Sequence, residues 1–465
     1  MHFISSLLSL SLLSLLLTAG EGYSQAEQAK APSDSTELSP PAQAVLGAQG
    51  RELTIDEAIA RAMGRSYNVV RAENERDAAR ELARSNLALV GPRATINYNE
   101  FHYDDTQEIP AGAFSPNPIL LRDDTTKTGS LIVTQPITGL YGYIENARRS
   151  GVQEDLSEET LRRERSNAGF AGAEAFLRAY NAQEQVGISE SAVAAAQSSA
   201  NDATVSERVG RMNKADYLRL QVNLSQAQSR LAQMRAERVA AIAALRQTLR
   251  LPPEDVFYLK QDLPEPQISS PAIEAAITEA LGRRPDVKEA ALRAEVVSFQ
   301  KQAAYAEFIP SVEVFGQLDR NFGEITGLGN PERDVQYWGV KASWTFWNNG
   351  ASVFKAREAF ASTRAAEATA EQTKDLARVD VIAAVENLQA AREALKFAEA
   401  GVAQAEEAYR IDNIRFKSGS ITATDQILSE STKSNVQGQF VNSRTQLLAS
   451  FFRLQKALGQ DQPKL

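Results

Sequence analysis

Two short segments contain the polar residues whose spacing is most suggestive of chemistry. "ERVGRMNKAD" and "FKSGSITATD" each place a glycine six residues before an aspartate, Gly210 before Asp216 and Gly419 before Asp425. Carboxylates in such segments have two ordinary uses. They cap or solvate the start of a helix, or they attract cations as the acidic rings of pores do. The choice between them depends on the elements that hold the segments.

The rest of the chain offers no catalytic constellation. It has no cysteine, which removes thiol catalysis, disulfides, Cys-ligated metals and a lipoprotein anchor. Its only histidines are His2 and His102. Phosphate loops, dinucleotide fingerprints, serine-hydrolase elbows, zincin motifs and calcium loops are absent from the sequence. We therefore expect neither an enzyme nor a bound metal or cofactor.

Charge gives a further exclusion. The formal net charge is −9 and the isoelectric point is near 5.2, which argues against nucleic acid as a partner. Asp and Glu alternate with Lys and Arg every few positions along helical tracts. That pattern is typical of solvated helix faces rather than of paired catalytic carboxylates.

The sequence is internally duplicated. "AIARAMGRSYNVVRA" at 58–72 matches "AITEALGRRPDVKEA" at 276–290, a shift of 218 that also brings Pro92 onto Pro310. Further along the shift is 209, and it brings Gly210 onto Gly419 and Asp216 onto Asp425. Paired Gly, Pro and Asp are not explained by a shared alanine-rich composition, so we infer two copies of one structural unit. The intervals where the shift changes read as loops.

The duplication and the composition divide the chain. Residues 1–26 read as a signal peptide, because the first twenty residues contain no Asp, Glu, Lys or Arg and hold an apolar core, although the usual basic start is missing. Residues 27–50 read as a flexible segment, 51–251 as the first repeat, 252–271 as a Pro-rich linker, 272–460 as the second repeat and 461–465 as a tail. Export is favoured over a membrane anchor.

Proline and heptad spacing predict very long helices. No proline occurs between 137 and 251 or between 332 and 462, and proline is excluded from helix interiors. In the second tract large residues recur every seven positions at Val381, Leu388, Leu395 and Val402, and alanines form the complementary series at Ala384, Ala391, Ala398 and Ala405. This is a coiled-coil seam with close helix approach, in a helix from about Ser352 to Ile411.

Segments with period two precede each long helix. "YWGVKASWTFW" and "PSVEVFGQLD" alternate apolar and polar residues, and "PRATINYNEF" and "TGSLIVTQPI" do so less regularly in the first copy. Strands of this length and alternation are typical of transmembrane β-barrels. All three tryptophans fall in the first of these segments, so we expect Trp338 and Trp344 to form a lipid-facing aromatic girdle in one strand. A sheet lying on a soluble core is the alternative.

The strand count then predicts an assembly. Two strands per copy give four per chain, and four strands cannot close a barrel without open edges in lipid. Several chains must therefore share one barrel, and a trimer would supply twelve strands, an even number within the usual range.

At this point the motifs show a family resemblance. "LTIDEAIARAMGRSYNVVRA", "RRPDVKEAALRAE", "VTQPITGLYG", "VGRMNKADYLRLQVNLSQAQSRL" and "FKSGSITATDQILSESTKSN" resemble the repeated signatures of the TolC-type outer-membrane efflux proteins, from about Leu53 to Gly459. The resemblance implies a homotrimer with a twelve-stranded outer-membrane β-barrel and a long periplasmic α-barrel of coiled-coil helices. It also implies a periplasmic adaptor protein and an inner-membrane pump as partners.

The resemblance gives the two glycine-containing segments a place and a role. They would be helix–turn–helix tips at the periplasmic end, with Gly210 and Gly419 in the turns and Asn213 and Thr422 as helix caps. In the family such tips meet the adaptor, so docking is one interpretation and simple turns are the other.

The periplasmic gate departs from the family pattern. Where well-known members tie the position of Asp216 to a tyrosine and an arginine, this chain has Phe416 and Ile421, which offer no such latch. Closure would depend on packing of Phe416 and on rings of Asp216 and Asp425, unless the aspartates only cap their helices.

The leading functional hypothesis is an outer-membrane exit duct of a tripartite efflux or secretion system. The alternative is a periplasmic or surface coiled-coil scaffold without a pore. Drug efflux, protein secretion and metal export all remain compatible with the sequence.

Overall fold

A computed structural model describes residues 50–112, 116, 118–122, 124–260, 263, 272–322 and 334–464. The predicted signal peptide at 1–26 and nearly all of the flexible segment at 27–50 lie outside these residues, as does most of the linker. The contacts from Gly50 onward define one unit. The division into repeat domains stays a prediction.

Eight helices lie within the described residues. In the first half they are α1 (Ile55–Arg65), α2 (Tyr67–Ala88), α3 (Gly139–Arg208) and α4 (Lys214–Leu249). In the second half they are α5 (Ile273–Arg283), α6 (Pro285–Ala306), α7 (Ala351–Lys417) and α8 (Ala423–Ala457). Helices α3 and α7 are 70 and 67 residues long, so each extends ~100 Å at the 1.5 Å rise of an α-helix. The long-helix prediction is confirmed.

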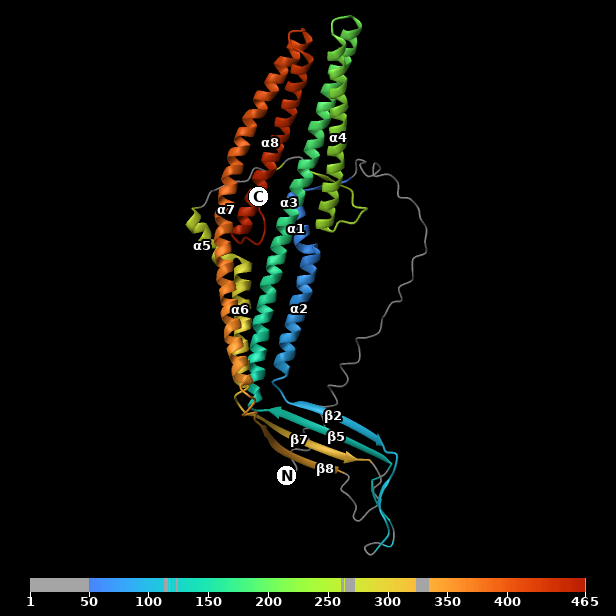
Figure 1. Cartoon of the computed structure of the whole chain (residues 1–465), viewed down its shortest axis with the longest axis vertical. Coiled ribbons are helices and arrows are strands. Elements are labelled where there is room, and N and C mark those ends of the chain that lie inside the picture. Colours follow the sequence, from blue (N-terminus) through green and yellow to red (C-terminus); the bar gives the residue numbers. More distant parts are fainter. Residues whose placement is uncertain are drawn as a thin grey trace. The chain divides into compact units, whose positions relative to one another are not determined.

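The helices and the main-sheet strands of the two halves correspond to each other (Figure 1). Adding 218 to the bounds of α1 and α2 gives those of α5 and α6. Adding 209 to the last residue of α3 and to the first residue of α4 gives those of α7 and α8. The duplicated repeat inferred from the sequence is therefore present in the fold.

The seven-residue series of α7 faces inward. Val381, Ala384, Leu388 and Ala391 are buried, and they form one cluster with residues of α5 and α8. A second cluster joins α1, α3, α4 and α8 around Phe176. Within it Gly172 allows the close approach of α1, because a Cβ there would lie 2.7 Å from that of Ala62. Small residues thus set the spacing of the helices.

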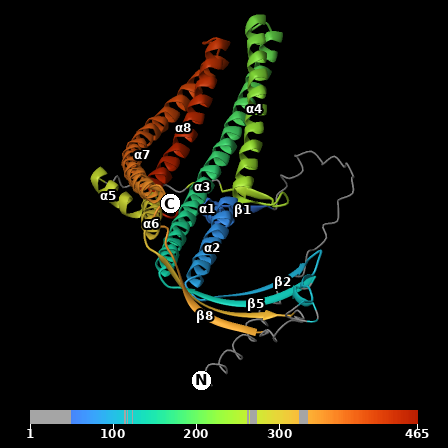
Figure 2. The same ribbon diagram turned by 60° about the horizontal axis from the view of Figure 1, so that its bottom comes forward.

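Strands make up the other layer. The main sheet has the order β2-β5-β7-β8, formed by β2 (Arg93–His102), β5 (Thr125–Pro136), β7 (Ser311–Asn321) and β8 (Asp334–Ser343). All three pairings are antiparallel, and Figure 2 shows the curvature of the sheet. The four-strand prediction is confirmed, and the sheet leads directly into α3 and α7.

Two smaller pairings lie outside this sheet. Strand β1 (Arg51–Leu53) pairs in parallel with β6 (Phe257–Leu259), which ties the start of the described chain to the linker region. Strands β3 (Gln107–Ile109) and β4 (Ile119–Arg122) form a short hairpin. The sequence predicted a plain loop between β2 and β5. That prediction is wrong, because β3 and β4 within this interval pair with each other.

No helix within the described residues has both the length and the apolar character needed to cross a membrane.

Candidate functional site

The main sheet has one apolar and one polar face, because paired residues of antiparallel strands project to the same side. The pairings place Trp338 beside Gly316 and Val133 beside Gly316 and Ala94. The apolar residues of this face are Ala94, Ile96, Tyr98, Leu131, Val133, Val312, Val314, Leu318, Trp338, Val340 and Ala342. Its polar residues are Glu100, His102, Thr125, Lys127, Gln135, Arg320, Asp334 and Gln336, most of them toward the strand ends. Nothing in the described chain covers Trp338, which is 84% exposed.

The opposite face is mainly polar. Its members include Thr95, Asn97, Asn99, Thr128, Ser130, Thr134, Glu313, Gln317, Asp319, Lys341 and Ser343, with Phe101, Ile132, Pro136, Phe315, Val335 and Tyr337 as apolar exceptions. Lys341 Nζ lies 3.3 Å from Glu313 Oε1 on the neighbouring strand. The face therefore combines charged and hydrogen-bonding groups, as a water-filled lumen requires.

The apolar face is bounded at both ends. Arg320 forms a bidentate pair with Asp334 at 2.7 and 2.8 Å, where β7 and β8 approach the loop between them. At the other end of β8 the aromatic rings of Trp344 and Phe346 lie 6.1 Å apart. Ten residues separate Asp334 from Trp344, which is roughly 33 Å of strand, or about 25 Å at a tilt near 40°. That is the height of a membrane-embedded apolar band.

The sequence predicted that the tryptophans lie in one strand, and this prediction is wrong. Trp338 belongs to β8, which ends at Ser343, and Trp344 and Trp347 follow it as non-strand residues. The physical reason is the lack of a partner, since β7 begins at Ser311 opposite Ser343. The lipid-facing role of Trp338 and Trp344 stays a prediction.

Both edges of the sheet are open within the described chain. Strand β2 has β5 as its only sheet partner and β8 has β7. Every residue of β2 and all but one of β8 are exposed, whereas β5 and β7 are mostly half-buried. Each edge thus offers a free row of backbone N–H and C=O groups to another strand.

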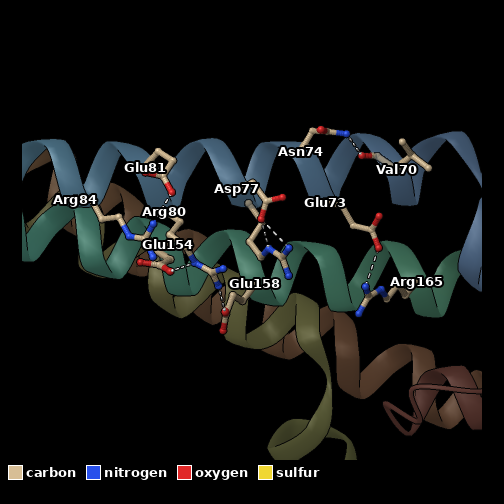
Figure 3. A network of polar contacts seen from close by, with 11 residues as sticks. Val70, Glu73, Asn74, Asp77, Arg80, Glu81, Arg84, Glu154, Glu158 and Arg165 are labelled. Carbon is tan, nitrogen blue, oxygen red and sulfur yellow. Dashed lines mark hydrogen bonds and ion pairs between the residues drawn. The ribbon is translucent and has the colours of Figure 1, made fainter. Parts of the chain in front are cut away.

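Helix faces outside the core hold ion-pair networks rather than catalytic groups. Figure 3 shows α2 beside α3, where Arg80 Nε lies 2.9 Å from Glu154 and Arg165 Nη2 lies 2.8 Å from Glu73. The hydrogen bond to Glu154 raises the pKa of Arg80. These pairs are solvated and contribute little individually.

The two hairpin turns are built alike. Gly210 and Gly419 have φ angles of 72° and 77°, which glycine adopts without strain. Asn213 accepts a hydrogen bond from the Asp216 amide at 2.8 Å, and Thr422 forms a capping box with Asp425. Both predicted helix caps form. Hydrogen bonds donated by the Thr422 hydroxyl and then by the Thr422 backbone N–H hold the pKa of Asp425 below its usual value.

In a single chain both aspartates lie in the first turn of their helices and bond to the capping residues. Asp425 accepts from the Thr422 backbone N–H in the capping box, and Asp216 accepts from the Asn213 side-chain amide. Asp216 also accepts from Arg219 at 2.9 Å on its own helix. Arg415 lies 3.9 Å from Asp412, likewise on its own helix. Arg415 also lies close enough to Asp425 to help lower the pKa of that carboxyl. The carboxylate rings expected at the gate would need further copies of the chain.

Phe416 connects the two hairpins near their turns. It packs against a cluster with Ala203 of α3, Leu220 of α4 and Ala423 of α8. Met212, Tyr217 and Ile427 complete the cluster. An apolar contact thus stands where the family latch is polar.

Sequence reasoning missed a buried polar pair close to this cluster. Gln426 is fully buried and both of its amide atoms lack partners, and Glu430 is 6% exposed with Oε2 unpaired. Burial raises the pKa of Glu430 to about 7, against the opposing effect of Lys433. The spacing of Ala423, Gln426 and Glu430 at i, i+3 and i+7 was the available signal, since it places all three on one face of α8.

We expect Glu430 to make stability fall with rising pH. Its raised pKa means that the protonated form is preferred in the folded state, so stability is highest below its ordinary pKa near 4.5 and is lost as the pH rises through about 7. The loss is about 3 kcal/mol at most. Glu430→Gln should reduce the drop in melting midpoint between pH 5 and pH 8, while exposed Glu399→Gln should leave it unchanged. An identical drop in wild type and Glu430→Gln would contradict the assignment.

Residues 276–460 match the family model described as outer membrane efflux protein. No curated protein sequence matches the chain significantly.

Solved structures resemble nearly the whole chain. A membrane protein from Pseudomonas aeruginosa is 18% identical, with 88% of this chain and 91% of that chain covered and a TM-score of 0.75. The Campylobacter jejuni outer membrane channel CmeC is 15% identical, with 87% and 85% covered and a TM-score of 0.77. The Vibrio cholerae outer membrane protein VceC is 19% identical, with 87% and 96% covered and a TM-score of 0.71.

These matches confirm the resemblance and the fold class. The chain has the fold of TolC-type outer-membrane proteins, and residues 276–460 carry the sequence pattern of the outer membrane efflux protein family. The description of that family, outer membrane efflux protein, agrees with the expected outer-membrane location and with transport rather than catalysis.

Proposed function

We propose that the protein is the outer-membrane exit duct of a tripartite export system. The observation that carries the proposal is the two-faced sheet, whose apolar side matches a bilayer in height and whose polar side lines a lumen. The sheet continues directly into α3 and α7 (Figure 1), so the helices would extend the same passage into the periplasm.

Assembly follows from the open edges. Unpaired backbone groups are too costly in lipid to remain at β2 and β8. We infer a homotrimer whose twelve strands close one β-barrel, with outer-membrane lipid against Trp338 and Trp344. The scaffold alternative has no use for an exposed tryptophan on an apolar sheet face.

The partners would be a periplasmic adaptor and an inner-membrane pump. The hairpin turns at Gly210 and Gly419 are the proposed docking tips, with Asn213 and Thr422 holding the returning helices in place. The channels CmeC and VceC have similar folds, which supports the proposal without identifying the cargo.

Conductance tests the duct directly. The purified trimer in a planar bilayer should give discrete current steps, and Phe416→Ala should enlarge them more than Ile421→Ala, because Phe416 packs between the two hairpins and Ile421 is outside that cluster. Replacing both Asp216 and Asp425 by alanine should weaken cation selectivity if they form rings. If the trimer inserts into the bilayer but neither the wild type nor Phe416→Ala carries current, the duct is contradicted and the scaffold alternative is favoured.

If the adaptor docks at the tips, a large side chain in either hairpin turn should block export. Gly210→Trp and Gly419→Trp should abolish export in the native host without lowering trimer yield, whereas alanine at the same positions should preserve it. Alanine imposes the same strain at positive φ but leaves the surface open. Ethidium efflux and the profile of secreted proteins are first compared between the native host and a strain that lacks this protein. The activity that is lost in that strain then serves as the measure of export. Normal export by both tryptophan variants would exclude the tips as the docking site.

A further inference from the structure

The internal duplication supplies a template for the contact between copies of the chain. Within one chain, β5 of the first half pairs with β7 of the second half, from Thr128 opposite Asn321 to Pro136 opposite Glu313. The counterpart of β5 under the shift of 209 is β8, because Thr125 corresponds to Asp334. The counterpart of β7 under the shift of 218 is β2, because Ser311 corresponds to Arg93. These two counterparts are the open edges of the sheet.

We propose that β8 of one copy joins β2 of the next copy in the register that β5 and β7 use within a chain. The pair Thr134 and Phe315 then maps to Ser343 (134 + 209) opposite Asn97 (315 − 218). In the same way, Ile132 and Gln317 map to Lys341 opposite Asn99. The proposal rests on the homotrimer of the proposed function and specifies which residues meet at its seam.

The chemistry of the two edges agrees with this register. It places Trp344 opposite Ile96 and Ala342 opposite Tyr98, so the apolar face continues across the seam. Ser343 and Asn97 continue the polar face. A slip of one residue would put Trp344 opposite Asn97 and reverse every pair between the faces.

The register also accounts for the early end of β8. In a single chain Trp344 has no strand beside it, since β7 begins opposite Ser343. Between copies, residues 344 and 345 would pair with Ile96 and Thr95. The bond from Ile137 N to Val312 O at 2.7 Å would recur from Phe346 to Ala94. The joined strand is therefore longer than β8 alone.

The helix layer follows the same relation. Helix α3 packs along α6 within a chain, and Arg163 Nη1 lies 3.1 Å from Glu289 Oε2. Their counterparts are Gln372 of α7 and Arg71 of α2, both exposed in a single chain. An Arg71 guanidinium can donate to the Gln372 side-chain oxygen, so the seam between copies keeps a polar contact without the ion pair.

In the proposed register, Ser343 and Asn97 form a non-hydrogen-bonded antiparallel pair, the type whose Cα atoms lie closer together. Phe322 N donates to Lys127 O at 2.9 Å, which marks Lys127 and Phe322 as a hydrogen-bonded pair. Because the two types alternate, Thr134 and Phe315 form a non-hydrogen-bonded pair, with Cα atoms about 4.5 Å apart. Ser343 and Asn97 inherit that geometry, which suits a disulfide.

Cysteine cross-linking tests the register in the full chain, which has no cysteine of its own. Ser343→Cys with Asn97→Cys should give covalently linked copies on oxidation, as should Lys341→Cys with Asn99→Cys. The matched controls exchange the two asparagines: Ser343→Cys with Asn99→Cys, and Lys341→Cys with Asn97→Cys. Those diagonal neighbours lie about 7–8 Å apart, so their yield should be at least tenfold lower. Thr134→Cys with Phe315→Cys serves as the intrachain oxidation control.

The outcomes separate this inference from the proposed function. Stronger cross-linking of either exchanged pair than of the proposed pairs would mean a register displaced by two residues and would overturn the inference. Trimers by native mass measurement that cross-link through none of the pairs would also overturn it, while leaving the duct in place. A protein that is a monodisperse monomer with its full strand content would contradict both the proposed register and the proposed duct.

Discussion

The cost of leaving backbone hydrogen-bonding groups unpaired in lipid is the constraint on which this structure depends. A four-stranded sheet with an apolar face can enter a bilayer only if the free rows along β2 and β8 are paired. Helices cannot supply that pairing. Another copy of the same sheet can, because β8 and β2 are the repeat counterparts of strands that already pair within the chain.

Duplication therefore does more than lengthen the protein. Each half supplies a strand pair and a long helical hairpin, so a ring built from whole chains alternates seams within and between copies. The two kinds of seam have diverged in chemistry. Glu289 is buried beside Arg163 within a chain, whereas the corresponding position is Arg71 at the chain's outer face. In the proposed trimer, such divergence would make the six units of the ring similar but not identical.

The hairpin tips show divergence of another kind. Asn213 and Thr422 cap corresponding helices with different side chains and the same geometry. One turn further along α8, Gln426 and Glu430 have no counterparts of their type in α4, where the corresponding residues are Tyr217 and Gln221. The contact between the two hairpins thus includes buried polar groups close to Phe416. Buried groups without partners favour separation of the elements that bury them, so this contact is weaker than an apolar one of the same size.

Much of the fold could be predicted because the regular spacing of apolar residues is a strong signal of helices and strands. Heptad spacing located α7, and alternation located the four strands of the main sheet. Paired Gly210 and Gly419 located the turns, since only a repeated backbone requirement explains them.

What escaped prediction depended on partners that the sequence does not show. Strand β8 ends before Trp344 because its neighbour begins at Ser311, which no local pattern encodes. Strands β3 and β4 flank a sequence rich in Pro and Gly and are too short for a clear alternation. Glu430 read as a solvated carboxylate because its burial comes from packing against other helices rather than from its neighbours in sequence.

The central claim is that the apolar face of the sheet lies in lipid, and the tryptophans provide the most direct test. The chain has three tryptophans, so Trp344→Phe with Trp347→Phe leaves Trp338 as the single emitter. Reconstituted into bilayers of lipids brominated on their acyl chains, this variant should lose most of its fluorescence, and aqueous iodide should have little effect. Strong quenching by iodide with no response to brominated lipid would place Trp338 in water and contradict the account.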